Sequence, residues 1–516
     1  MIGAAVAGAL AALAGTAAAA ELRVVLPSDI RSTNAGVNRD QVTDWVLHHV
    51  VEGLVALDGA LRPAPLLAED WTVSANGTVY EFRLRDGLTF HNGAPVTASE
   101  VVWSWRRLLD PATRWLCRSW FDGSGGTGIR VVGLEAAGPG TVRFTLERPN
   151  PLFLTRMAHA VCLSGILHPD SVDGAGRWRM PVATGPYRLA DWRRGREVTL
   201  SRFEGYRPRP QPADGLAGGR DAMVDTLRLM VVPDGTAAKY AVLSGAADLW
   251  PAASAEAVPR LSEGGAVRLM EEETADVAVL LMRDADPLLS DPRIRRAVAH
   301  ALDRAEIARS TLFARTDANP SAVPRASRFW TPEHGAALPH DPARARALLA
   351  EAGYDGQPLR IQVSRDNHLY LNDAVVIQAQ LRAAGLNAVI ETYDWATQYR
   401  NYQAGDYQLS VMGFSGRPDP TLMYETFVGD RAQRANVVVD EPGAVALLAR
   451  SAAEPDEAER KHLLADLHAR VVEDATLLAL YTPRRLTALG PRVAEYPGWA
   501  LAMPRLWTVR LAEDAR

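Results

Sequence analysis

Three short apolar segments alternate with two helical patterns between residues 359 and 412, and this alternation constrains the fold more than any other feature of the chain. The expected strands are Leu359–Val363, Asn387–Thr392 and Tyr407–Met412, and the expected helices are Asp373–Ala384 and Asp394–Ala404. A glycine follows each helix, where helices commonly end. A β-α-β-α-β succession predicts parallel strands joined by right-handed crossovers. The sequence therefore indicates an α/β domain.

Two loops leave this predicted sheet at its carboxyl edge, where open α/β sheets bind ligands. The first is the turn Tyr393–Trp395, and the second is Phe414–Asp419, whose glycine and proline interrupt the strand pattern. Because both loops follow parallel strands, we expect them to lie on one edge and to form a binding site together.

The length and charge of the chain set further limits. With 516 residues it is too long for one ordinary core, so we expect two or three lobes. The formal net charge of -5, with no basic cluster, argues against nucleic acid as a partner. Thr97 and Glu100 predict a capping box at the start of a helix. Other patterns predict strands at Glu21–Leu26, Thr78–Arg85, Ile129–Leu134, Thr141–Leu146, Glu197–Ser201, Val224–Val232, Val277–Met282 and Leu477–Tyr481.

The N-terminal residues 1–20 are almost all alanine, glycine, leucine and valine. They end in Ala17–Ala20, a run of small residues of the kind that signal peptidase cleaves. We interpret the segment as a secretory signal cleaved near Ala20, because it is too weakly hydrophobic for a membrane anchor. No basic residues precede it, so we expect the natural start upstream. The cleavage point has no cysteine, so we expect no lipid anchor.

The chain has two cysteines, Cys117 and Cys162, which form either one disulfide in an oxidising compartment or two buried free thiols. The adjacent His48 and His49 point to different faces of a helical segment, and we interpret them as core or surface residues, not metal ligands. Gly123–Gly128 matches the spacing G-x-G-x-x-G, but a strand follows it where a nucleotide site needs a helix. We therefore expect a turning loop there and predict no cofactor.

Several blocks resemble one family. The longest is Tyr80–Ser104, which reads YEFRLRDGLTFHNGAPVTASEVVWS, and shorter blocks are Glu52–Val55, Thr184–Tyr187 and Asp291–Val298. Together they resemble the extracytoplasmic solute-binding proteins of peptide/nickel/opine ABC transporters, in the dipeptide- and oligopeptide-binding class. The resemblance covers essentially the whole mature chain.

The resemblance implies an α/β, periplasmic binding protein-like fold of two hinged lobes with an extra subdomain on the first lobe. The expected divisions are 21–52, 183–270 and 479–516 for lobe I, 53–182 for the subdomain, and 271–478 for lobe II. It further implies a periplasmic monomer that captures a short peptide or peptide-like solute between the lobes and delivers it to ABC permease subunits at the inner membrane. Alternatives are a carboxylated, opine-like solute, a metal chelate, a chemosensory role or, with less support, a secreted enzyme.

The resemblance also assigns candidate ligand residues. Peptide binders of the family carry an aspartate in the loop after the last α/β strand, and here Arg417 occupies that position. A guanidinium suits a carboxylate or phosphate and repels an ammonium group. Asp419 is an alternative source of the acid, or part of a turn with Pro420.

Aromatic residues complete the predicted site. Trp395 and Phe414 match aromatic positions that line the family's pocket, although ordinary core packing is the alternative for both. Trp120 in the subdomain is a further candidate, and Ser415 lies in the same loop as Phe414. No serine elbow, cysteine–histidine set or metal-ligand spacing indicates catalysis, so we expect a binding protein and not an enzyme.

Overall fold

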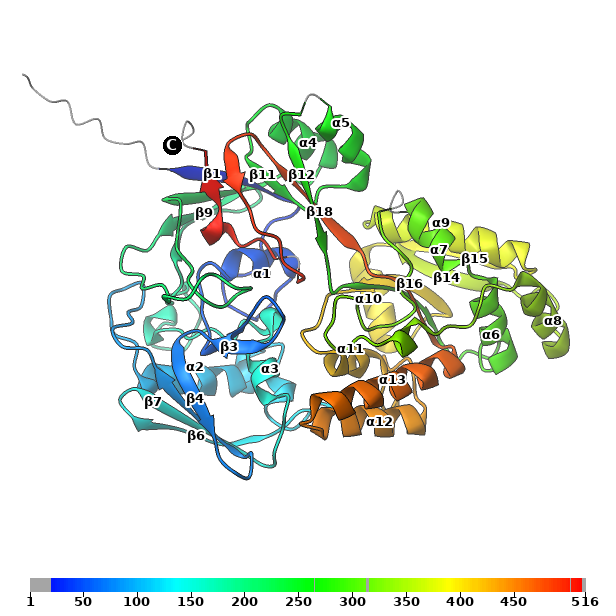
Figure 1. Cartoon of the computed structure of the whole chain (residues 1–516), viewed down its shortest axis with the longest axis horizontal. Coiled ribbons are helices and arrows are strands. Elements are labelled where there is room, and N and C mark those ends of the chain that lie inside the picture. Colours follow the sequence, from blue (N-terminus) through cyan, green and yellow to red (C-terminus); the bar gives the residue numbers. More distant parts are fainter. Residues whose placement is uncertain (1–19, 264, 312–314, 502, 513–516) are drawn as a thin grey trace, which may run out of the picture.

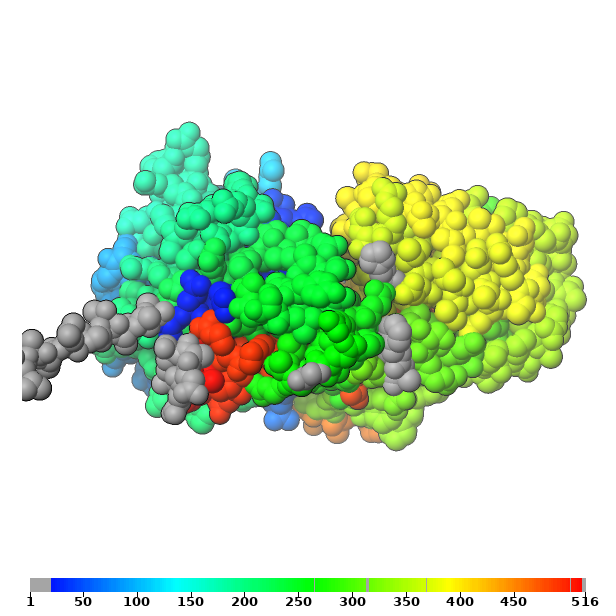
Figure 2. Space-filling model, turned by 90° about the horizontal axis from the view of Figure 1, so that it is seen from above, coloured from blue at the N-terminus to red at the C-terminus, as the bar shows by residue number. Residues whose placement is uncertain are grey.

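A computed structural model describes residues 20–263, 265–311, 315–501 and 503–512. Two lobes lie side by side, and the chain crosses between them twice (Figure 1). Seen from above, the surface is hollowed where the lobes meet (Figure 2). The expected signal segment lies, apart from Ala20, outside the described residues. Within them, no helix is long and apolar enough to cross a membrane.

Lobe I is built on a seven-stranded sheet in the order β12-β18-β11-β1-β10-β9-β8. Strand β1 lies between β10 and β11 and is parallel to both, whereas β18 is antiparallel to β11 and β12. The strands are β1 (Glu21–Leu26), β8 (Tyr187–Arg193), β9 (Glu197–Arg202), β10 (Thr226–Val231), β11 (Leu249–Pro251), β12 (Arg268–Glu273) and β18 (Arg484–Leu489). Helices α1 (Gln41–Leu47), α4 (Gly235–Leu243) and α5 (Val258–Ser262) belong to this lobe, with the short pair β19 (Val493–Glu495) and β20 (Arg510–Leu511).

A subdomain extends lobe I with a four-stranded antiparallel sheet in the order β4-β5-β7-β6. Its strands are β4 (Ala68–Val73), β5 (Val79–Leu84), β6 (Val131–Gly138) and β7 (Thr141–Leu146), beside the hairpin β2 (Val55–Leu57) and β3 (Pro63–Pro65). Helix α2 (Ala98–Leu109) begins at the expected capping box of Thr97 and Glu100. Helix α3 (Phe153–Met157) packs against β2. Alternate side chains of β5 are buried, as the period-2 pattern predicts.

Lobe II contains a five-stranded sheet in the order β15-β14-β16-β13-β17. Strand β14 is parallel to β15 and β16, which confirms the expected β-α-β-α-β unit, and β13 runs antiparallel to β16 and β17. The strands are β13 (Val277–Met282), β14 (Leu359–Ser364), β15 (Ala388–Tyr393), β16 (Leu409–Phe414) and β17 (Leu477–Tyr481). The helices are α6 (Pro292–Ala301), α7 (Arg304–Thr311), α8 (Pro342–Ala352), α9 (His368–Ala383), α10 (Trp395–Ala404), α11 (Pro420–Phe427), α12 (Pro442–Ala453) and α13 (Glu457–Asp474).

Strand β16 begins and ends two residues later than the expected Tyr407–Met412. The antiparallel neighbour β13 explains the shift, because Gly413 and Phe414 pair with Ala278 and Val277 and extend the ladder past the glycine. A sequence pattern read on one strand alone does not contain this pairing.

The two chain crossings between the lobes lie next to each other. One follows β12 and the other joins β17 to β18, and the hydroxyl of Thr274 in the first donates to the carbonyl of Pro483 in the second at 2.5 Å. The expected boundaries 270/271 and 478/479 fall inside β12 and β17. Adjacent short crossings of this kind allow two lobes to rotate as rigid bodies.

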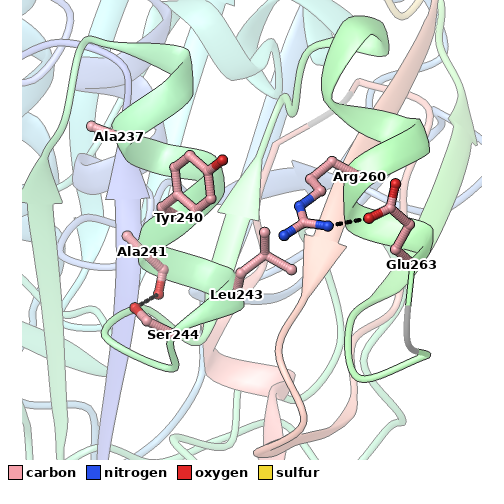
Figure 3. A pocket seen from close by; sticks show the side chains of 7 residues that line it. All are labelled: Ala237, Tyr240, Ala241, Leu243, Ser244, Arg260 and Glu263. Atoms are coloured by element: carbon pink, nitrogen blue, oxygen red, sulfur yellow. Dashed lines mark hydrogen bonds and ion pairs between the residues drawn. The ribbon is translucent and has the colours of Figure 1, made fainter.

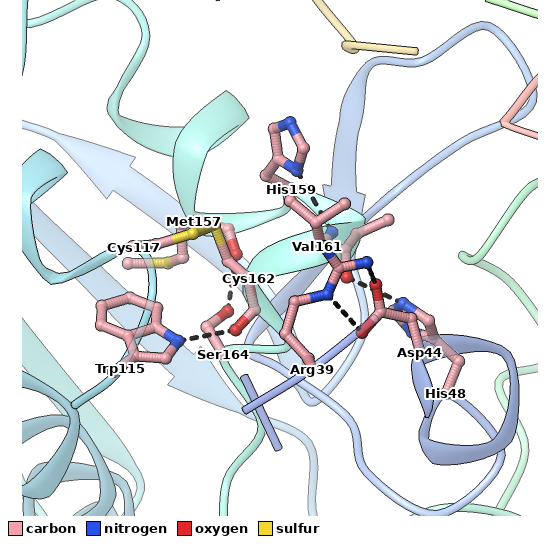
Figure 4. Close-up of a disulfide and its surroundings, with 11 residues drawn as sticks. Arg39, Asp44, His48, Trp115, Cys117, Met157, His159, Val161, Cys162 and Ser164 are labelled. Atoms are coloured by element: carbon pink, nitrogen blue, oxygen red, sulfur yellow. Dashed lines mark hydrogen bonds and ion pairs between the residues drawn. A yellow bond between two sulfur atoms is a disulfide. The ribbon is translucent and has the colours of Figure 1, made fainter. Parts of the chain in front are cut away.

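Cys117 and Cys162 form a disulfide with a Cα–Cα distance of 5.6 Å, which decides between the two alternatives left open by the sequence. The Nε1 atom of Trp115 donates to the carbonyl of Cys162 beside it (Figure 4). His48 and His49 are both buried core residues, each bonded to a backbone carbonyl. Among the described residues, no group of three or more metal-ligating side chains is present.

Candidate functional site

Helix α10 presents two exposed aromatic rings at the carboxyl edge of the lobe II sheet. Asp394 caps the helix by accepting from the backbone of Thr397, so Trp395 becomes its first residue. Trp395 and Tyr399 are 39% and 45% exposed, and their ring centroids lie 5.6 Å apart. Large aromatic side chains exposed together are unusual on a soluble protein and provide contact area for a ligand.

Phe414 ends β16 on the same edge, but its ring faces inward for much of its surface. It packs edge-on against Tyr402 at 5.6 Å and against Phe427 at 4.7 Å. The half-buried ring therefore packs against the buried Tyr402 of α10 and has only part of its surface toward solvent.

The loop after β16 holds Arg417 in place. The backbone N–H of Gly416 donates to Asp276 at 2.7 Å, which ties the loop to the chain crossing. The Nη1 atom of Arg417 donates to the carbonyl of the exposed Ser415 at 2.7 Å. In the part of the chain that the structure describes, this guanidinium makes no ion pair with a carboxylate, although Asp276 lies near enough to act on its charge.

Asp419 points away from this loop into lobe II. The Nη2 atom of Arg460 donates to both of its carboxylate oxygens at 2.6 and 2.7 Å, and the N–H of Thr421 donates to it at 2.9 Å as α11 begins. Its side chain is buried. This carboxylate therefore caps α11 and pairs with Arg460, and Pro420 is the first residue of that helix and not part of a separate turn.

Lobe I contributes His159, Trp120 and Arg39 to the surface that meets lobe II. The imidazole of His159 lies 5.3 Å from the ring of Trp120, centroid to centroid. Its Nδ1 accepts from the N–H of Val161 at 3.2 Å, and Arg39 donates to both carboxylate oxygens of Asp44 (Figure 4). The disulfide connects the turns that carry Trp120 and His159, because Cys117 and Cys162 lie three residues from them.

Positive charges from both lobes act on the same space. Burial lowers the pKa of Arg417 below its ordinary value, and Arg39 on the opposite lobe lowers that pKa further. Burial also holds the pKa of His159 well below its usual range, and Arg417, Arg39 and Arg156 act in the same direction, in that order. The site is therefore electropositive and suits an anionic or electron-rich group.

A second set of contacts fastens the two lobes together. Thr127 donates to Glu425 of α11 through its N–H at 3.1 Å and its hydroxyl at 2.9 Å, and Arg156 donates to the same carboxylate at 3.0 Å. Gly126 has a φ of +30° and lies close to this carboxylate: a Cβ atom at that position would lie 2.7 Å from Oε1 of Glu425, so a larger residue would displace the Glu425 side chain from its contacts. The glycine loop that matches G-x-G-x-x-G thus serves as an interlobe latch, defined as Thr127, Arg156 and Glu425. A small apolar cluster of Leu152, Leu422 and Ala452 also joins the lobes.

We expect Glu425→Gln to shift the protein toward an open state without destabilising either lobe. Arg156 is fully buried, so the closed form would then contain a guanidinium without its carboxylate, at a cost of about 2–3 kcal/mol. That corresponds to about 30- to 150-fold in the closure equilibrium. Small-angle X-ray scattering would detect a larger radius of gyration. The control is Glu351→Gln, whose partner Arg344 lies on the same exposed helix of lobe II. Scattering identical to that of the wild type would contradict the latch.

Two pockets of the described residues lie away from this site. One of about 620 Å³ lies in lobe I between α4 and α5. Its close-up shows Tyr240, a hydrogen bond from the Ser244 hydroxyl to the Ala241 carbonyl, and the exposed ion pair of Arg260 and Glu263 (Figure 3). A cavity of about 30 Å³ lies inside lobe I and is lined by buried polar residues that include His48, Glu52, Arg220 and His159. Neither has a lining residue from lobe II.

The sequence missed several residues of the interlobe surface. Tyr399 follows Trp395 by one helical turn, a spacing visible in the sequence. The latch carried no local signal, because its residues are far apart along the chain, and the local partners of Arg39 and His159 do not reveal that the two residues lie near lobe II. Arg156 and Glu425, for example, are 269 positions apart.

Comparison with known proteins gives consistent matches. The family model for bacterial extracellular solute-binding proteins, family 5 Middle, matches residues 62–434. A probable deoxycholate-binding periplasmic protein of Escherichia coli is 25% identical over 473 residues, or 86% of this chain and 85% of that protein. A periplasmic binding protein of A. tumefaciens in complex with agropinic acid has a TM-score of 0.78 at 23% identity, covering 96% of this chain and 99% of that one. The ABC transporter-associated periplasmic binding protein DppA of Helicobacter pylori, in complex with the peptide STSA, has a TM-score of 0.79 at 22% identity, covering 95% of this chain and 98% of that one.

Proposed function

Because the chain belongs to family 5 of the bacterial extracellular solute-binding proteins, the solute-binding components of ABC importers, we propose that it captures a short peptide or peptide-like solute between its lobes. The solute would then be delivered to permease subunits at the inner membrane, by a monomer in the periplasm. The observation that carries the proposal is the electropositive space between the lobes, next to the paired chain crossings. Two lobes hinged in this way close around a ligand.

The residues proposed to bind the solute come from both lobes. Trp395 and Phe414, with Tyr399, supply apolar area on lobe II, and Trp120 supplies it on lobe I. Aromatic walls hold side chains of different shapes at little entropic cost. Arg417 supplies the charge, with Ser415 fixing its guanidinium. Asp419 was the other candidate for a charged contact, and its bond to Arg460 supports leaving it outside the site.

A second candidate is a carboxylated solute that is not a peptide, such as an opine. The charge of Arg417 favours it, because a guanidinium binds a carboxylate and repels the α-amino group of a peptide. The relatives' printed ligands, deoxycholate, agropinic acid and a peptide, all carry a carboxylate. We propose binding and transport as the role of this site, not catalysis.

A thermal-shift screen of di- and tripeptides, opines and metal chelates tests the function. A ligand at 100 times its Kd stabilises a protein by about 2.7 kcal/mol. We expect at least one peptide or opine to raise the melting temperature, and Arg417→Asp to abolish that shift or change which compounds produce it. An unchanged ligand profile in Arg417→Asp would remove Arg417 from the site. No response to any compound would count against the binding function itself.

A further inference from the structure

The imidazole of His159 has a hydrogen-bond donor without an acceptor. The side chain is 2% exposed, and its Nε2 atom has no hydrogen-bond partner. Because Nδ1 accepts from the N–H of Val161, the proton of the neutral ring is on Nε2. The neutral form is the one present, since burial and the surrounding arginines hold the pKa of His159 well below its usual range. A buried N–H without a partner costs about 1–3 kcal/mol, so an acceptor there would be strongly favoured.

The ring of His159 lies beside the contact between the lobes: it is 5.3 Å from the ring of Trp120, and Arg156 of the latch lies 5.7 Å from that same ring. In the close-up, Nε2 lies on the side of the ring away from Met157, Ser164 and His48, which line the small cavity with it (Figure 4). Arg417 of lobe II is the charge that acts most strongly on the imidazole. The unpartnered donor of lobe I and the guanidinium of lobe II therefore lie close enough to bind one ligand group together.

The charges around His159 leave one guanidinium uncompensated. Two of the three arginines that act on the pKa of His159 have a carboxylate each: Arg39 with Asp44, and Arg156 with Glu425. Arg417 forms no such pair among the residues that the structure describes, and its bond to the carbonyl of Ser415 leaves other donors free. With the lobes closed, Arg417 and Arg39 repel each other, as their effect on the pKa of Arg417 indicates. An anion between them would relieve this repulsion.

We propose that His159 of lobe I and Arg417 of lobe II form a split subsite for the carboxylate of the transported solute. The subsite rests on the proposed function and narrows it to acidic solutes. The carboxylate accepts the Nε2–H of His159 through one oxygen and the guanidinium of Arg417 through the other, both charge-assisted bonds. Because each lobe supplies one partner, the bonds form together only when the lobes close. The acid group thus couples recognition to closure.

Calorimetric titration with matched acids and amides tests the subsite. The probes are glutarate, L-alanyl-L-alanine, glutathione and agropinic acid, each compared with the derivative in which its carboxylates are amides. We expect at least one acid to bind, and its amide to bind at least about 30-fold more weakly. Arg417→Met is expected to lower the affinity for the acid by about 30-fold or more, and His159→Phe to lower it by about 10- to 100-fold. Neither variant should change the affinity for the amide much.

His159→Gln is the matched control, because its amide nitrogen places a donor near the position of Nε2. It should retain most of the affinity that His159→Phe loses, provided that circular dichroism shows both variants folded. The subsite is refuted if acids and amides bind equally, if only neutral or cationic solutes bind, or if His159→Phe keeps the acid preference. In those cases a solute is still bound, so the binding function survives. Binding of no probe at all, acid or amide, would refute the subsite and the proposed function together.

Discussion

Replacing Cys117 and Cys162 together with serine is expected to lower the free energy of unfolding of lobe I by about 4 kcal/mol, because the disulfide closes a loop of 45 residues in the unfolded chain. Urea denaturation followed by tryptophan fluorescence measures the effect, since Trp115 hydrogen-bonds to Cys162. The same change should weaken solute binding, because the bond fixes the turns that carry Trp120 and His159 relative to each other.

Chemical reduction of the disulfide provides the control. These are the only cysteines of the protein, so dithiothreitol has no other disulfide to reduce. The reductant should destabilise the wild type and leave the double serine variant unchanged. Equal denaturation midpoints for the oxidised wild type and the double variant would show that the bond contributes nothing to stability.

Asp419→Ala is expected to destabilise lobe II by about 3–5 kcal/mol, since it leaves the buried guanidinium of Arg460 without its partner. The loss of the cap at the start of α11 acts in the same direction. Guanidinium denaturation measures the change. In contrast to Glu425→Gln, which breaks an interlobe pair, this substitution should leave the closure equilibrium of the folded protein unaltered.

Two companion variants separate the effect of charge burial from that of pairing itself. Glu351→Ala breaks an exposed pair and should cost less than about 1 kcal/mol. The double variant Asp419→Leu, Arg460→Met should recover most of the loss, because apolar residues of similar size replace buried pairs at little cost. If Asp419→Ala were no more harmful than Glu351→Ala, the buried pair would have no structural importance.

Local signals in the sequence predicted much of the fold. The capping box of Thr97 and Glu100, the glycines after α8 and α10, and the alternation within β5 each depend on residues close together in the chain. Parallel pairing of β14 with its neighbours followed from chain direction alone. The position of β16 did not, because its last residues are held by β13, whose pairing is nonlocal.

The candidate site likewise contains residues that local sequence patterns predicted and residues that they did not. The two loops that carry Trp395 and Arg417 were predicted because they follow strands of one continuous α/β unit, and the family resemblance then singled out these two residues as candidates. His159 could not be found, since its importance depends on a donor without an acceptor and on an arginine from the other lobe. The carboxylate of Asp419 was equally ambiguous until its partner Arg460, 41 positions later, was placed against it.

The position of β18 has a consequence for the order of assembly. This strand, near the end of the chain, lies between β11 and β12, and β1 at the other end pairs with β10 across 205 positions. The lobe II sheet, in contrast, comes from one uninterrupted stretch, 277–481. Nonlocal pairing slows folding, because the entropy of closing long loops must be overcome first. Lobe II can therefore fold while the chain is still emerging, whereas the sheet of lobe I is completed last, and a protein truncated before β18 would lack the strand that joins β12 to β11.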